Sequence, residues 1–99
     1  MIAVESLSKD EWLVTVTTRS TTQHRVRVTP KDLQRYGGDN ISAQQLLQAS
    51  FRFLLDRESN TSILPSFDLP VITRYFPEYE KEIHRFLQEL KPVEDRGCQ

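Results

Sequence analysis

Three arginines in the first third of the chain have the types and spacing best suited to a chemical role. Arg25 and Arg27 alternate with Val26 in a run typical of a β-strand, so both guanidinium groups should point to one face. Arg19 lies in the polar connector before this run. Guanidinium groups pair bidentately with phosphate, and neighbouring threonine hydroxyls add further donors. Arg19, Arg25 and Arg27 are therefore our candidate anion-binding residues.

The same strand face has a plainer interpretation as an exposed edge that charge protects from unwanted pairing. It offers Thr15 and Thr17 but lacks the aromatic side chains on which single-stranded bases stack. The chain has 13 Lys and Arg against 14 Asp and Glu, a formal net charge of −1, which argues against a partner held by an overall basic surface. A nucleic-acid or anion-binding regulator is therefore the alternative hypothesis.

Charge is nevertheless distributed unevenly along the sequence. The range 12–35 has five basic residues and one acid, a local charge of +4, whereas 58–99 has five basic and eight acidic residues, a local charge of −3. Such asymmetry can steer an anionic ligand to one face or align two copies head to tail. It is also what an ordinary solvated surface can look like.

No other constellation predicts catalysis or metal binding. His24 lies on the valine side of its strand, where a hydrogen-bonded structural imidazole is the usual outcome. Glu80 and His84 are one helical turn apart, but a zinc site needs three or four converging ligands. Cys98 is the single cysteine, and Gly37–Asp39 lacks the spacing of a phosphate loop. The sequence therefore predicts no catalytic residue, no cofactor and no metal.

The elements that hold these residues begin with a β-hairpin. Alternating side chains over 12–18 and again over 24–29, separated by a polar connector, predict two antiparallel strands with their valines inward. The range 2–6 is either a short edge strand or a loosely held arm. Because an isolated hairpin is marginally stable, we expect either this segment or a second chain to extend the sheet.

Helix signals follow the hairpin. Thr29-Pro30 should begin a short helix that Gly37-Gly38 ends, and Ser42 with Gln45 has the spacing of a capping box. The second helix should run to about residue 58, with an apolar arc wider than one face requires. Asp68 is expected to cap another short helix. The predicted helices span 30–36, 43–58, 69–76 and 77–91.

We therefore predict an α+β fold, a short antiparallel hairpin sheet packed against three or four α-helices. Residues 1–92 should form one domain, and 93–99, beyond Pro92, a flexible C-terminal tail. The longest apolar runs are two or three residues, which excludes a membrane span, and the first ten residues lack the pattern of a signal or transit peptide. We accordingly expect a cytoplasmic protein.

A cluster of aromatic residues near the C-terminal helix predicts an interface. Tyr75, Phe76 and Tyr79 are close in sequence, and a domain of this length buries only about two thirds of its unfolded surface. Some of these rings should stay outside unless a partner covers them. The leading hypothesis is a non-enzymatic protein-interaction module, expected to be a homodimer.

Several runs resemble a small bacterial family of uncharacterised single-domain proteins. They are the Ser-Phe-x-Phe-Leu-Leu-x-Arg-Glu run of 50–58, 62–64, 67–69, the Tyr-Phe-Pro-Glu-Tyr run of 75–79 and the hairpin segment 12–16. These residues are mostly large and apolar, so the resemblance implies a shared core. It implies no activity and no cofactor.

Overall fold

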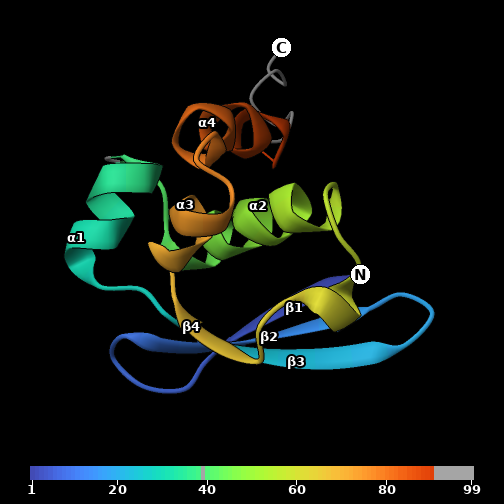
Figure 1. Ribbon diagram of the computed structural model, residues 1–99. Helices are drawn as coiled ribbons and strands as arrows, with labels where there is room; N and C mark the ends of the chain where they lie inside the picture. The colour runs from blue at the N-terminus through green and yellow to red at the C-terminus, as the bar shows by residue number, and fades with distance from the viewer. Residues whose placement is uncertain (39, 91–99) are drawn as a thin grey trace, which may run out of the picture.

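The computed structural model describes residues 1–38 and 40–90, and its fold is α+β, as predicted. A mixed sheet of four strands in the order β1-β2-β3-β4 carries its helices on one face (Figure 1). The strands β1 (Ile2–Ser6), β2 (Glu11–Thr17) and β3 (Thr21–Arg27) are antiparallel, and β4 (Ser66–Asp68) runs parallel to β3. No helix of the described residues covers the opposite face of the sheet, which we call the bare face.

The predicted hairpin and the orientation of its faces are confirmed. Val14 lies opposite His24 in the β2–β3 register, and both are buried under the helices with Val26. The segment 2–6 supplies a third strand, so the chain itself extends its sheet. Its edge is held by the Met1 amino group, which donates to the Thr17 carbonyl at 2.8 Å.

Strand β4 was not predicted. It has three residues between Pro65 and Pro70, too few to show the alternation typical of a strand. Its pairing depends on contacts with β3, far away in sequence: the Arg25 amide donates to the Pro65 carbonyl at 2.8 Å, and the Leu69 amide donates to the Arg27 carbonyl at 3.0 Å. Only the assembled sheet therefore makes this segment a strand.

The capping signals located two helix starts correctly. Thr29 and Asp32 form a capping box at α1 (Pro30–Asp32), which continues into the π-helical turn η1 (Leu33–Gly37). Gly38 then takes φ 86°, a left-handed conformation that suits glycine, and ends the helix as expected. Ser42 and Gln45 cap α2 (Ala43–Leu55) reciprocally, with hydrogen bonds of 2.9 and 3.1 Å.

The later helices are α3 (Val71–Tyr75) and α4 (Tyr79–Leu90). The prediction that Asp68 caps α3 is wrong, because Asp68 is the last residue of β4 and Pro70 precedes the helix without a side-chain cap. Between α2 and β4 lies the short 3₁₀ turn η2 (Asn60–Ser62). Pro92 and the expected tail, 93–99, lie outside the described residues.

The wide apolar arc of α2 is explained by its place between two neighbours. Figure 1 shows α2 between the sheet and α4. On the sheet side, the Phe51 ring lies 5.4 Å from the His24 ring and 6.2 Å from that of Phe67. On the other side, the Phe53 ring meets Tyr79 of α4 at 5.2 Å. Both sides of the helix are therefore core.

Tyr79 has a buried hydroxyl with one clear hydrogen-bond arrangement. Its oxygen lies 2.6 Å from Ser50 Oγ, and Ser50 Oγ donates to the Leu46 carbonyl at 2.7 Å. Since the serine proton is used on that carbonyl, the tyrosine must donate to Ser50. Burial is the main cause that raises the pKa of Tyr79 far above its ordinary value. The phenol therefore remains protonated in the folded chain.

This raised pKa predicts a loss of stability in alkali. An unfolded tyrosine ionises near pH 10, so above that pH the folded state holds a proton that the unfolded state has released. The free energy of unfolding should fall by up to about 1.4 kcal/mol per pH unit from Tyr79 alone. In denaturant melts between about pH 8 and 11, the free energy of unfolding should fall less steeply with pH in Tyr79→Phe than in the wild type. The control is Tyr75→Phe, which changes an exposed ring and should give the same slope as the wild type. Equal slopes in all three proteins would contradict the assignment.

Candidate functional site

The structure separates the three candidate arginines. Arg25 and Arg27 are exposed on the bare face of the sheet, as predicted, but Arg19 lies in the β2–β3 turn. Thr21, which pairs with Thr17 beside that turn, is four residues before Arg25. At about 3.3 Å per residue, the turn is more than 10 Å from Arg25. Arg19 therefore does not join the other two in one site.

Acidic side chains share the bare face with the two arginines. Arg27 lies between Glu11 of β2 and Asp68 of β4, and Arg25 lies opposite Leu13, whose partner on β1 is Glu5. Paired residues of neighbouring strands point to the same face. The face is therefore mixed in charge, and nothing in its described residues converges on an anion.

We predict that replacing Arg25 and Arg27 together by alanine changes the free energy of unfolding by no more than about 0.5 kcal/mol, because both side chains are exposed. Denaturant melts test this. On a polyanion column, wild type and double variant should elute together at low salt, since neighbouring acids offset the arginines. If the column retained the wild type but not the double variant, the result would instead support the anion-binding hypothesis.

The predicted aromatic interface is only partly exposed. Tyr75 is 64% exposed and Phe76 is half-buried, but Tyr79 is 0% exposed and belongs to the core. Including Tyr79 in an exposed patch was therefore wrong. The first turn of α4 packs onto α2 and η1, where Tyr79 contacts the rings of Phe53 and Tyr36 at 5.2 Å each. Tyr75 instead borders a hollow that the sequence did not reveal.

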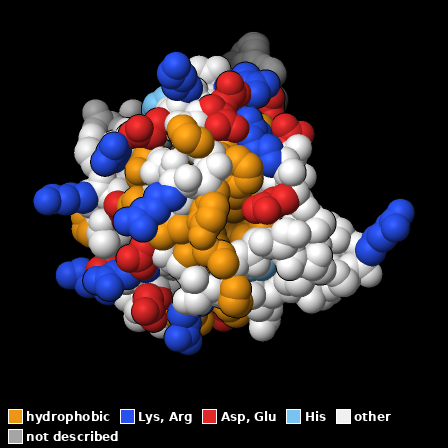
Figure 2. All heavy atoms as spheres, in the orientation of Figure 1, with side chains coloured by type: hydrophobic (Ala, Val, Ile, Leu, Met, Phe, Trp, Pro, Cys, Tyr) orange, Lys and Arg blue, Asp and Glu red, His pale blue; other side chains and the backbone are white. Residues whose placement is uncertain are grey.

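This hollow, which we call the apolar groove, lies between the C-terminal end of α2, the segment 62–67 and α3. Its volume is about 280 Å³. Figure 2 shows apolar side chains forming a continuous band over this face of the molecule. Leu64, 40% exposed, and Tyr75 are the outermost of its apolar residues. Its lining residues are Leu54, Glu58, Ser62, Ile63, Leu64, Phe67, Val71, Ile72, Tyr75 and Phe76.

The wall that carries Leu64 is fixed to the sheet by His24. The imidazole is buried, with Nδ1 2.8 Å from the Leu64 carbonyl and Nε2 2.8 Å from Thr22 Oγ1. A carbonyl can only accept, so Nδ1 carries the proton, and in the neutral ring Nε2 accepts from Thr22. The structural interpretation of His24 agrees with these bonds. The groove wall is thus held in place before any partner arrives.

Glu58 gives the apolar groove an acidic border. Its side chain is half-buried and forms no hydrogen bond or ion pair with any described residue. Arg57, the adjacent cation, is already engaged: Nε lies 2.9 Å from Glu78, NH1 lies 3.7 Å from Asp56, and the guanidinium is 3.8 Å from the centroid of the Phe53 ring. Helical carbonyls at the end of α2 add negative potential here.

The remaining polar residues of the described ranges were compared with the requirements of a metal site. In the range 1–38 and 40–90, no three His, Cys, Asp or Glu side chains come together as metal ligands. Glu80, considered with His84 from the sequence, instead accepts from Arg35 Nε at 2.8 Å. Within the same described residues we find no helix with the length and hydropathy needed to cross a bilayer.

Comparisons of the chain with protein-family models, with curated proteins and with solved structures gave no match. The suggested resemblance to a bacterial family therefore stays a prediction. The fold and the groove define the chain as an α+β domain that carries an apolar groove between α2, the segment 62–67 and α3. The groove escaped the sequence analysis because 59–65 has the composition of a loop, and its residues meet only in three dimensions.

Proposed function

We propose that this protein is a non-enzymatic interaction module that binds a protein partner through the apolar groove. The observation that carries the proposal is the exposure of Leu64 and Tyr75 beside an apolar hollow whose base is formed by buried residues of the core. Large apolar side chains around a preformed hollow are typical of sites that hold an anchoring side chain of a partner. No comparable set of converging polar groups favours catalysis among the described residues.

The structure gives less support to self-association than the sequence alone did. The sheet gains β1 and β4 from the same chain, so a second copy is not needed to complete it. The second argument for a dimer was that more aromatic rings would be exposed than a monomer tolerates. Among the described residues, however, Tyr75 is the only strongly exposed aromatic residue. In place of the homodimer expected from the sequence, we therefore propose a foreign protein as the occupant of the groove.

Site-specific photo-crosslinking tests the proposal. A photoreactive residue in place of Tyr75 should yield a crosslinked species in nuclease-treated native extract, and Leu64→Ser in the same chain should remove it. The matched control carries the same group in place of Leu7, which is 42% exposed in the β1–β2 turn, away from the groove. Equal crosslinking from both positions, or none from position 75, would contradict the proposal. Loss of the product after nuclease treatment would favour the nucleic-acid hypothesis.

A further inference from the structure

We infer that the apolar groove takes an extended segment of a partner protein, with a large apolar side chain close to a lysine or arginine. This inference rests on the proposed function and names the chemistry of the partner. Three independent features support it: the size of the groove, the open edge of β4 beside it, and the unpartnered carboxylate of Glu58.

The size of the groove suits one or two side chains. Its volume of about 280 Å³ lies just below the range of about 300–1,000 Å³ that is usual for small-molecule and cofactor pockets. Ile63 and Ile72 are buried at its base, while Leu64 and Tyr75 stand at the rim. An apolar anchor inserted between the rim residues would remove them from water, which favours association.

The open edge of β4 accounts for the extended conformation of the segment. Pro65 and Leu69 direct their backbone bonds toward β3. Because successive residues of a strand point their backbone groups in opposite directions, the N–H and C=O of Ser66 and Asp68 point toward the free edge. Figure 1 shows β4 at that edge of the sheet. A peptide can add there as a further strand, as in other β-augmented complexes.

The apolar groove and this edge are one surface. Phe67, the middle residue of β4, pairs with buried Val26 and so points to the helix-covered side, where it lines the groove. A strand added beside β4 would place every second side chain on that same side. One such side chain would enter the groove while the backbone pairs with Ser66 and Asp68.

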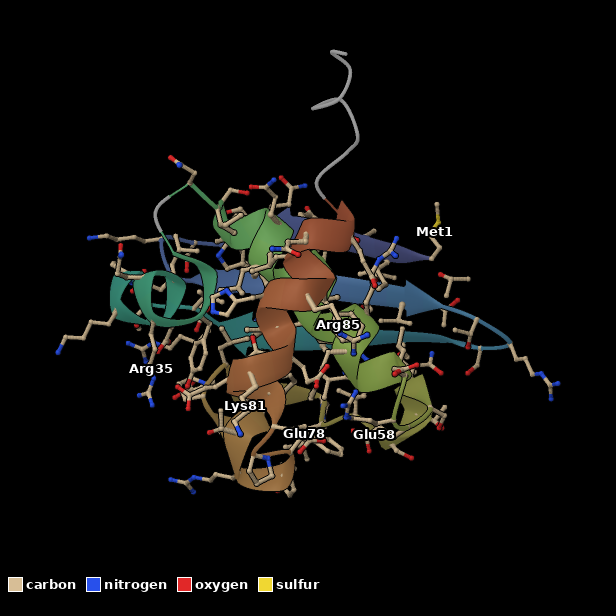
Figure 3. All side chains as sticks on the ribbon, turned by 90° about the horizontal axis from the view of Figure 1, so that it is seen from above. Met1, Arg35, Glu58, Glu78, Lys81 and Arg85 are labelled. Atoms are coloured by element: carbon tan, nitrogen blue, oxygen red, sulfur yellow. The ribbon has the colours of Figure 1, made fainter. Side chains whose placement is uncertain are left out.

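Charge then selects the neighbouring residue of the partner. Figure 3 shows Glu58 and Glu78 on one side of the molecule. Asp56 adds a third carboxylate. Arg57 is paired with Glu78 and Asp56, and Arg85 also interacts with Asp56, so neither arginine forms an ion pair with Glu58. Arg19 borders the adjoining hollow with Glu58, but the two form no ion pair. A lysine or arginine of the partner would supply Glu58 with the counter-charge that it lacks.

Selection from a displayed library of random linear peptides on the full chain tests the inference. We expect the enriched peptides to share a large apolar residue with Lys or Arg one or two positions away. A synthetic copy should bind Glu58→Gln about two- to fivefold more weakly than wild type, with the difference shrinking in high salt. The matched control, Glu5→Gln on the bare face of the sheet, should bind as the wild type does. N-methylation at the residues that pair with β4 should abolish binding.

The outcomes separate this inference from the proposed function. The enriched peptides could depend on Leu64 and Tyr75, so that Leu64→Ser and Tyr75→Ser weaken their binding, and yet contain no basic residue and bind Glu58→Gln as well as the wild type. This result would overturn the inferred chemistry of the partner, but binding in the groove would still be supported. Peptides whose affinity is unchanged by both rim substitutions would overturn the inference. If crosslinking from position 75 also failed, the proposed function would be overturned as well. Concentration-dependent self-association that the rim substitutions abolish would make a second copy the occupant and overturn the inference.

Discussion

Replacing Phe53 by alanine is expected to lower the free energy of unfolding by about 3–5 kcal/mol, the loss typical of a large aromatic truncated in a core. The Phe53 ring is fully buried and meets three others edge-on: Phe76 at 5.9 Å, Tyr79 at 5.2 Å and Phe86 at 5.8 Å. The Arg57 guanidinium also stacks on it. Because small domains are commonly stable by only about 5–15 kcal/mol, the variant should be close to unfolding.

Denaturant melts measure the effect, and Tyr75→Ala is the matched control. Tyr75 is another aromatic of the same region but is exposed, so its truncation should cost no more than about 0.5 kcal/mol. If Phe53→Ala itself does not fold, Phe53→Leu should still show a measurable loss of about 1–2 kcal/mol. A loss below about 1 kcal/mol for Phe53→Ala would place this side of α2 at the surface.

Asn60→Ala should be the most damaging polar substitution in the described chain, at about 2–3 kcal/mol. The buried Asn60 Nδ2 donates to the Ser20 carbonyl at 3.1 Å and to Thr22 Oγ1 at 3.0 Å, with a longer bond of 3.4 Å to the Val16 carbonyl. Its Oδ1 accepts from Thr18 Oγ1 at 3.2 Å. Alanine would leave these groups without their partner.

Asn40→Ala provides the control, because it is the same substitution at an exposed position and should change stability by less than about 0.5 kcal/mol. Asn60→Asp keeps an acceptor for Thr18 but brings a carboxylate toward backbone carbonyls, so it should be at least as destabilising as alanine. Thermal or denaturant melts compare all three. If Asn60→Ala lost no more stability than Asn40→Ala, water would have to replace the hydrogen bonds that Asn60 makes to the hairpin.

How much of this structure could be predicted depends on how local its causes are. The caps at Thr29 and Ser42 and the stop at Gly38 are set by neighbouring residues, and all three were placed correctly. Alternation also placed the valines of β2 and β3 on the buried face. These features need only a few consecutive residues, so the sequence is enough to recognise them.

The features that were missed depend on distant residues. Asn60 contacts the hairpin 40 residues earlier, and β4 is a strand only because β3 lies beside it. Helical spacing from Ile83 and Leu87 does place Tyr79 on the buried face of α4. The aromatic run itself does not show that Tyr75, at the end of α3, faces water. The apolar groove requires α2, β4 and α3 to be in place together, so no single segment carries its signal.

The position of α2 between the sheet and α4 determines how this domain should open. Detaching α4 exposes only one side of α2 and leaves the other side packed on the sheet. Separating the sheet from α2 would instead break the contacts of α2 with the strands and open the main core. Partial opening should therefore begin at α4. In native-state hydrogen exchange, the amides of α4 should exchange through this smaller opening, and those of α2 and β2 only when the whole domain unfolds. The helix α2 and the inner strand β2 would then be the most slowly exchanging elements of the molecule.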